Sequence, residues 1–495
     1  MADRRSENPH AIFIPYPLQG HLIPSVQLAI KLASKGFTIT FINTQSIHHA
    51  ITKSSQEDVF AEARRSGLDI RYATVSDGLP LGFDRSLNHD QYMECLFHVF
   101  SAHVDEVVGN LVKSDPSISC LIADSFYVWP SMISNKYKLV NISFWTEPAL
   151  ILSLYHHLDL LKNNGHYDPL DKFEDVIDYI PGITSIKPRD LMSYLQAADT
   201  NTVVHRIIHK ALFEATKKAD FVVCNTIQEL ESHTIATFNH TQPFYAIGPI
   251  FPDDFTQELV PTSLWSETDC TTWLNGRPPK SVLYVSFGSY AHTTKHELAE
   301  IAHGLVRSGV SFVWVLRPDI VSSSDSDHDA LPFGFEDQVK DQGLIVPWCN
   351  QKTILSHRSI GGFLTHCGWN SILESIWCGV PLICYPLLTD QFTNRKLVVD
   401  DWKIGMNLCD ESLQVGREEV SKKVKDLMIG EKSNEVTRNG IKKVQKTLQD
   451  ALGTNGSSQA NFKRFINEVK NRVYKVKPVK LTQQESSRSS YGLNH

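Results

Sequence analysis

A histidine and an aspartate follow two short apolar runs, where they could form a proton-transfer pair. His21 comes shortly after the run AIFIPY (residues 11–16), and Asp124 ends the run SCLIAD (residues 119–124). Histidine titrates near neutral pH, and a buried carboxylate bonded to one ring nitrogen fixes the tautomer that leaves the other nitrogen free to take a proton. The pair would therefore activate a hydroxyl as a nucleophile. Without further information, a helix cap is an equally good explanation of Asp124.

A second chemical signal is the stretch GGFLTHCGWNS (residues 361–371), which has the pattern of a strand, a small-residue turn and a helix start. Asn370 and Ser371 are good helix-capping residues, and the free N–H groups of a helix N-terminus bind anions. Gly368 lets the backbone approach a ligand closely. The stretch predicts a seat for a diphosphate.

Two neighbouring residues could hold the rest of a nucleotide. Glu374, in the first turns of the same helix, could accept hydrogen bonds from both hydroxyls of a ribose. Trp348, at the end of another apolar run, offers a flat face to a base. Taken one at a time, such residues are more often a solvated helix charge and a core tryptophan.

A further turn, VSFGS (residues 285–289), places Ser289 between a strand and a helix, where it could contact phosphate. A pair of aspartates that could hold a metal at a strand end is not apparent. The sequence DSD (residues 325–327) lies in a polar stretch that we interpret as a solvated loop. We therefore expect the site to work without a metal.

The elements that must position these residues are apolar strands alternating with amphipathic helices. A length of 495 residues favours two domains of about 200–250 residues each. Strands buried on both faces are typical of parallel sheets covered by helices, and ligands bind at the carboxyl ends of such strands. The fold class predicted is α/β, with two doubly wound Rossmann-like domains facing across a cleft. The expected strands are 11–16, 37–43, 119–124, 220–225, 281–287, 311–317, 344–348, 361–366 and 381–386, with helices at 23–35 and 296–308.

Composition excludes several classes of protein. The net charge of −7, from 48 basic and 55 acidic residues, disfavours nucleic acid as a partner. An apolar run of about 18 residues is lacking, so we expect no membrane span, and the start MADRRSENPH does not resemble a signal peptide. Nine cysteines include no Cys-x-x-Cys pair, and Cys224, Cys367 and Cys384 lie in apolar segments, which favours a cytoplasmic location.

The 44 residues from 348 to 391 resemble, without gaps, the signature box of plant secondary-product glycosyltransferases. That box opens with Trp, contains HCGWNS and closes with Asp-Gln. The chain is accordingly identified as a member of the plant UDP-dependent glycosyltransferases, which implies the two-domain GT-B fold and inverting transfer. Tyr385 departs from the usual Trp at its position, and we expect this change to have little effect.

The resemblance implies UDP-glucose as donor, because Gln at the last position of the box commonly accompanies glucose. It also implies a role for each matching residue: catalysis by His21 as base with Asp124 as its partner; stacking on uracil by Trp348, with Gln351 beside the nucleoside; diphosphate contacts by Ser289, His366, Asn370 and Ser371; ribose contacts by Glu374; and contacts to the transferred sugar by Thr146, Trp369, Asp390 and Gln391.

The acceptor is expected in the N-terminal half, in an apolar pocket suited to a flavonoid, terpenoid or similar small molecule. Candidate walls are Phe126 and Tyr127, with Trp129 and the segments 87–100 and 183–205. Glu147 stands where small residues are usual; it could reshape acceptor choice or point into solvent. Neither the acceptor nor the hydroxyl it uses follows from the sequence.

With these roles, the expected organisation is an acceptor-binding domain (1–248), a linker (249–265), a UDP-sugar-binding domain (266–455), a C-terminal helix (456–473) that could pack back on the first domain, and a disordered tail (474–495). We expect a monomer that needs no cofactor besides the UDP-sugar. The rival hypotheses are a catalytically silent nucleotide-sugar-binding protein, an epimerase and a retaining transferase.

Overall fold

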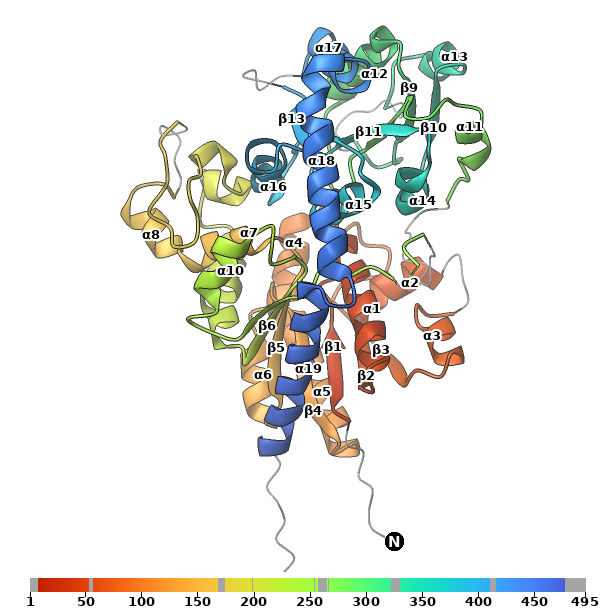
Figure 1. The fold of residues 1–495 in the computed structure, drawn as a ribbon. Coiled ribbons are helices and arrows are strands. Elements are labelled where there is room, and N and C mark those ends of the chain that lie inside the picture. Colours follow the sequence, from red (N-terminus) through yellow and green to blue (C-terminus); the bar gives the residue numbers. More distant parts are fainter. Residues whose placement is uncertain are drawn as a thin grey trace, which may run out of the picture.

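The computed structural model describes residues 8–52, 57–167, 174–197, 199–252, 254–256, 265, 267–321, 330–409 and 415–476. The DSD loop, most of the expected linker and the tail from residue 477 lie outside the described residues. Figure 1 shows two lobes, one above the other, that meet in the middle of the molecule.

The first lobe is built on a seven-stranded parallel sheet of order β3-β2-β1-β4-β5-β6-β7. Its strands are β1 (His10–Ile14), β2 (Thr38–Thr44), β3 (Ile70–Val75), β4 (Ile118–Asp124), β5 (Val140–Trp145), β6 (Phe221–Cys224) and β7 (Phe244–Ala246). Its α-helices are α1 (Gln19–Ala33), α2 (Gln45–Thr52), α3 (Ala61–Arg65), α4 (His89–Glu94), α5 (Phe100–Ser114), α6 (Pro130–Tyr137), α7 (Ala149–His156), α8 (Leu158–Asn163), α9 (Val203–Ile207) and α10 (Ser232–Phe238). Short 3₁₀ helices at Pro188–Asp190, Ser193–Gln196 and Thr216–Lys218, and π-helical turns at Cys95–Val99 and Ile208–Ala215, complete it.

The second lobe has a six-stranded parallel sheet of order β10-β9-β8-β11-β12-β13. Its strands are β8 (Val282–Ser286), β9 (Ser311–Val315), β10 (Gly343–Val346), β11 (Ile360–Thr365), β12 (Leu382–Cys384) and β13 (Gly405–Asn407). Its helices are α11 (Thr271–Asn275), α12 (Lys295–Ser308), α13 (Phe335–Val339), α14 (Gln351–Ser356), α15 (Trp369–Cys378), α16 (Gln391–Lys396) continued by a π-helical turn (Leu397–Asp401), α17 (Arg417–Met428) and α18 (Glu431–Leu452). The predicted α/β class with two doubly wound sheets is confirmed.

Both sheets are buried on two faces because successive side chains of a strand point to opposite sides. In β1, Ala11 and Phe13 pack into the core beneath α1, whereas Ile12 and Ile14 join the core on the other face. This explains why the strands appear in the sequence as short continuous apolar runs.

The order of each sheet reverses at one place, between β1 and β4 in the first lobe and between β8 and β11 in the second. Ligands of doubly wound folds bind where the order reverses, at the carboxyl ends of the strands. His21 and Ser289 lie in the segments that follow β1 and β8, Asp124 ends β4, and His366 directly follows β11. Topology therefore brings these four residues to the two facing sheet edges.

The end of the chain returns to the first lobe. In Figure 1, the long helix α18 runs down from the second lobe, and α19 (Ser457–Val476) continues along the sheet of the first. Apolar residues Phe462, Phe465 and Val469 of α19 belong to the same buried cluster as Phe13 and Phe41. In the part of the chain that the structure describes, no helix is long and apolar enough to span a membrane.

Candidate active site

A cavity of about 310 Å³ lies between the carboxyl ends of the two sheets. Side chains from both lobes line it, including nearly all of the residues that the sequence singled out: His21, Phe126, Thr146, Ser289, Trp348, Gln351, His366, Trp369, Asn370, Ser371, Glu374, Asp390 and Gln391. Its size is that of a small-molecule site. Residues scattered over 370 positions of the sequence therefore meet in one place.

The histidine and the aspartate form a hydrogen-bonded pair. His21 Nδ1 lies 2.8 Å from Asp124 Oδ2, and the other carboxylate oxygen accepts the backbone N–H of Phe126 at 3.0 Å. Asp124 is buried behind the ring, whereas the His21 side chain is 12% exposed and lines the cavity. The Thr146 hydroxyl lies 2.9 Å from the same ring nitrogen. With Nδ1 protonated and held, Nε2 is the nitrogen free to accept a proton.

The helix that carries His21 starts earlier than expected. The sequence predicted a helix over residues 23–35, but α1 begins at Gln19, so His21 lies in its first turn and Pro24 lies inside it. Proline has no N–H, and the carbonyl of Gly20 is left without its intrahelical donor. Asn370 of the opposite lobe donates its side-chain N–H to that carbonyl at 2.8 Å. Because of the proline, the Gly20 carbonyl is free to accept a hydrogen bond from the opposite lobe, next to His21.

The predicted diphosphate seat is a helix start, but its capping residues differ from the prediction. Gly368 is the N-cap of α15 and provides no side-chain cap, whereas Asn370 and Ser371 lie in the first turn. Their side chains are therefore available for other contacts, and the first N–H groups of α15 face the cavity end uncapped. The preceding Cys367 has a φ of 67°, a left-handed backbone that non-glycine residues rarely adopt outside functional sites.

The ring of His366 lies between two glycines. A Cβ atom at Gly288 would come within 2.4 Å of His366 Nε2, and one at Gly368 within 2.5 Å. Only glycine fits at either position, and Gly288 also has a φ of 73°. Burial, aided by the positive charge of Arg317, lowers the pKa of His366 to about 4. The ring is therefore neutral at neutral pH and would serve as a hydrogen-bond donor.

At the nucleoside end, three polar side chains are linked. The Gln351 amide donates to Ser371 Oγ at 3.0 Å and to Glu374 Oε2 at 2.8 Å. Trp348 packs against Trp265, with ring centroids 4.8 Å apart. The amide orients the Glu374 carboxylate, and one tryptophan face borders the cavity beside it.

The predicted sugar-binding residues Asp390 and Gln391 lie at the start of α16. Asp390 accepts hydrogen bonds of 2.6 Å from the Thr389 hydroxyl and from the Asn394 amide, and burial raises its pKa. Gln391 uses its side-chain oxygen to accept the N–H groups of Leu387 and Leu388. These bonds hold the side chains in place and leave part of each facing the cavity.

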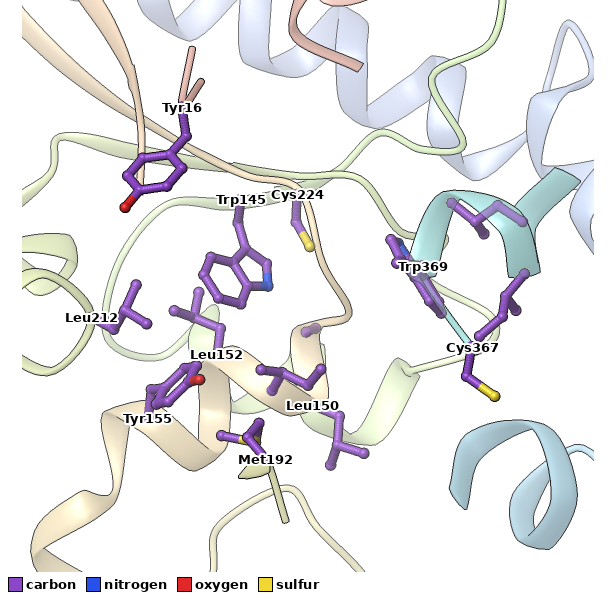
Figure 2. Close-up of a cluster of buried hydrophobic side chains, with 14 of the residues drawn as sticks. Tyr16, Trp145, Leu150, Leu152, Tyr155, Met192, Leu212, Cys224, Cys367 and Trp369 are labelled. Atoms are coloured by element: carbon purple, nitrogen blue, oxygen red, sulfur yellow. The ribbon is translucent and has the colours of Figure 1, made fainter. Parts of the chain in front are cut away.

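Trp369 joins the lobes rather than standing as a free wall. Its indole N–H donates to the carbonyl oxygen of Asn225 at 2.7 Å, and its ring is buried. Figure 2 shows Trp369 and Cys367 of the second lobe across from Trp145 and Tyr155 of the first, within one buried cluster.

Apolar and aromatic side chains line the part of the cavity where the acceptor is predicted to bind. Phe126 packs edge-on against His21 at 5.1 Å and stacks on Trp145. Tyr127 and Trp129 are instead buried in the core, and the Tyr127 hydroxyl donates to the carbonyl of Pro15. The structure does not bring Tyr127 to the cavity, because its ring packs in the core against Phe100 and Trp129.

Several cavity residues were not singled out. These include Tyr16, Tyr155, Tyr290 and Ile208, together with His89, Met93, Tyr194 and Val204 from the two predicted acceptor segments. The sequence contained a signal for Tyr16 and Tyr290 as cavity residues, since each lies within a few residues of a predicted site residue at a strand end. Tyr155 and Ile208 had no such signal, because each lies on the apolar face of a helical segment and looks like an ordinary core residue in the sequence.

Glu147 lines the same cavity and does not point into bulk solvent. Its side chain is buried, and Oε2 has no hydrogen-bond partner among the described residues. Burial raises the pKa of this carboxyl well above its ordinary value, and the negative charges of Asp390 and Asp124 add to the effect. Tyr385 does not line the cavity; it is buried in the core of the second lobe, where its ring packs on Phe287. Within the described ranges, no group of three or more His, Cys, Asp or Glu side chains could hold a metal ion.

Comparison with known proteins agrees with this geometry. Residues 266–446 match the family described as UDP-glucoronosyl and UDP-glucosyl transferase. UDP-glycosyltransferase 86A1 of Arabidopsis thaliana is 61% identical over 96% of this chain and 97% of its own. The 7-deoxyloganetin glucosyltransferase of Catharanthus roseus is 34% identical over 94% of this chain and 98% of its own.

A solved structure extends the likeness to the whole fold. That of Medicago truncatula UGT71G1 complexed with UDP-glucose is 26% identical, covers 95% of this chain and 100% of that chain, and has a TM-score of 0.77. The family expected from the signature box is confirmed: the chain belongs to the plant UDP-dependent glycosyltransferases and has their GT-B fold.

Proposed function

We propose that this glycosyltransferase transfers glucose from UDP-glucose, with inversion, to a hydroxyl of a small and largely apolar acceptor. The observation that carries the proposal is the His21–Asp124 pair, which meets the cavity opposite the uncapped start of α15. A base and an anion seat on facing lobes are what nucleophilic displacement at a sugar carbon requires.

In the proposed reaction, Nε2 of His21 takes the proton of the acceptor hydroxyl while its oxygen attacks the anomeric carbon. The new C–O bond forms as the bond from that carbon to the diphosphate breaks, and UDP leaves with the electron pair. Asp124 holds the ring and stabilises the imidazolium that forms. The opposite face of the sugar is attacked, so an α-linked donor gives a β-glucoside.

The leaving diphosphate carries negative charge, and the donors proposed to stabilise it are Ser289, His366, Asn370 and Ser371 with the N–H groups of α15. We propose that no metal takes part. Trp348, Gln351 and Glu374 would bind the nucleoside, and Thr146, Trp369, Asp390 and Gln391 the sugar. The similar structure of Medicago truncatula UGT71G1 is a complex with UDP-glucose, which supports this choice of donor.

For the acceptor we propose a phenolic or terpenoid alcohol. Phe126 and Tyr16 lie next to His21, and further aromatic and aliphatic side chains surround that end of the cavity. A flat or polycyclic apolar molecule with few hydroxyls fits such walls. A relative named as a 7-deoxyloganetin glucosyltransferase accords with the terpenoid option. We also propose a cytoplasmic location, since all nine cysteines are free thiols.

The test is incubation with UDP-glucose and a panel of phenolic and terpenoid alcohols, with and without EDTA. We expect β-glucosides at equal rates in both conditions. Loss of turnover in EDTA would refute the metal-free mechanism, and an α-glucoside would indicate retention. Binding of UDP-glucose with no product from any acceptor would favour a silent nucleotide-sugar-binding protein.

A further inference from the structure

Glu147 is an acidic residue of the cavity for which the proposed chemistry gives no role at the donor or the base. It follows Thr146 at the end of β5, in a position where the family usually has a small residue. The side chain is 8% exposed and lines the cavity, and its Oε2 has no partner among the described residues. A buried carboxyl oxygen left unpaired is costly unless a ligand supplies the partner.

The surroundings of Glu147 place it at the sugar end of the cavity. Glu147 lines the cavity together with Asp390, a proposed sugar-binding residue. Burial raises the pKa of Glu147, and the negative charges of Asp390 and of Asp124 in the proposed catalytic pair raise it further. Its chain neighbour Thr146 contacts His21 Nδ1. The space between these groups is where the anomeric carbon and its sugar ring would lie if the proposed function holds.

Charge in this corner of the cavity is acidic. The basic side chains lining the cavity are His21, His89, Lys352 and His366. His21 is bonded to Asp124 and Thr146, and His89 contacts the Tyr290 hydroxyl. Lys352 belongs to α14 at the nucleoside end. None of the hydrogen bonds or ion pairs described here joins a basic group to Glu147 or Asp390.

Two carboxyl groups facing the same desolvated space cannot both be ionised cheaply, so one of them keeps a proton. A protonated carboxyl has one O–H to donate and oxygens that accept, which matches a sugar hydroxyl.

We propose that Glu147 is a further sugar-binding residue, whose carboxyl binds a hydroxyl of the transferred sugar in the cavity that it lines together with Asp390. This inference rests on the proposed function, and it adds to that function a residue that the signature box does not contain.

The first experiment compares the affinity for UDP-glucose with that for UDP, which has no sugar, by calorimetry. In Glu147→Ala we expect UDP-glucose binding to weaken by about 3- to 12-fold, as for one lost hydrogen bond, while UDP binding changes by less than about twofold. Glu147→Gln keeps a donor and an acceptor and should stay within about threefold of the parent protein for both ligands. The control Glu267→Ala removes an acidic group that also lines the cavity, and should change both affinities equally.

The second experiment measures the KM for UDP-glucose and the KM for the acceptor. We expect Glu147→Ala to raise the KM for UDP-glucose by about 3- to 12-fold and to leave the KM for the acceptor within about twofold. An unchanged KM for UDP-glucose in a variant that folds would overturn the inference. So would an increase in acceptor KM with an unaltered affinity for UDP-glucose, since Glu147 would then contact the acceptor. A parent protein that transfers no sugar at all would refute the proposed function instead.

Discussion

Replacing Asp124 by asparagine changes one atom of the pair and reverses its hydrogen bond. The Oδ1 atom of Asp124 accepts the N–H of Phe126, so an asparagine would keep its oxygen there and turn its NH₂ group toward His21. That group donates, and Nδ1 must then accept. The ring proton moves to Nε2, the nitrogen proposed to take the proton of the acceptor hydroxyl, so the proposed base can no longer act.

We expect Asp124→Asn to lower kcat by about 10²- to 10⁴-fold, the full contribution of a positioned base, which corresponds to about 3–5.5 kcal/mol of activation free energy. Affinity for UDP should change by less than about twofold, because Asp124 lies behind the ring and not at the nucleotide end. The assay is the initial rate of glucoside formation at saturating donor and acceptor, with UDP affinity and the melting temperature measured on the same preparation.

Two further variants make the test sharper. Thr146→Val removes the other contact to Nδ1 but leaves the carboxylate in place, so its rate should stay within about tenfold of the parent. His21→Ala combined with Asp124→Asn should be no slower than His21→Ala alone, because the two residues act as one unit. A rate for Asp124→Asn within about threefold of the parent, or additive losses in the double variant, would refute the assignment of the tautomer.

Three other perturbations follow from the structure. Glu374→Ala should weaken UDP binding by about tenfold or more, as for a hydrogen bond to a charged group, when measured by calorimetry; an unchanged affinity would remove Glu374 from the ribose site. Gly288→Ala would force a Cβ atom against the His366 ring and strain a φ of 73°, at a cost of about 1–3 kcal/mol, so a lower melting temperature and weaker UDP binding are expected, and a neutral effect on both would contradict the packing described here. Burial lowers the pKa of His156 from 6.5 to about 3, so the neutral ring stabilises the fold fully above pH 6.5 and progressively less as pH falls toward 3; denaturation at pH 7, 5.5 and 4.5 should show a smaller acid loss in His156→Gln, and equal slopes would mean that the ring is not buried in its neutral form.

Much of the fold follows from the pattern of the sequence. Continuous apolar runs such as residues 119–124 are strands because both faces of each sheet are covered, and the alternation with helices allows only parallel connections of one hand. The same logic placed His21, Asp124 and His366 at sheet edges. These assignments needed only the local chain and the rule that ligands meet the carboxyl ends of strands.

Contacts between the lobes were beyond the reach of local patterns. Asn370 and Ser371 look like helix caps in the sequence, yet Gly368 is the cap, and Asn370 donates to Gly20, 350 positions earlier. Tyr127 and Phe126 are both aromatic and adjacent, and only the direction of each side chain separates a core residue from a cavity wall. Neither outcome is encoded in spacing, because each depends on which surface arrives from the other half of the chain.

The proline inside α1 is a local feature of the sequence that determines one of these contacts between the lobes. Pro24 leaves the Gly20 carbonyl, one residue before His21, without a donor from its own helix. Asn370, on the helix proposed to hold the diphosphate, donates a hydrogen bond to this carbonyl. Trp369 makes a parallel bond to the backbone of Asn225. A nucleotide that orders the start of α15 would therefore also fix the helix that carries the base. The proposed anion seat and the proposed base are held by one set of hydrogen bonds across the cleft, so loss of either contact between the lobes should lower the rate of glucoside formation as well as the affinity for UDP-glucose.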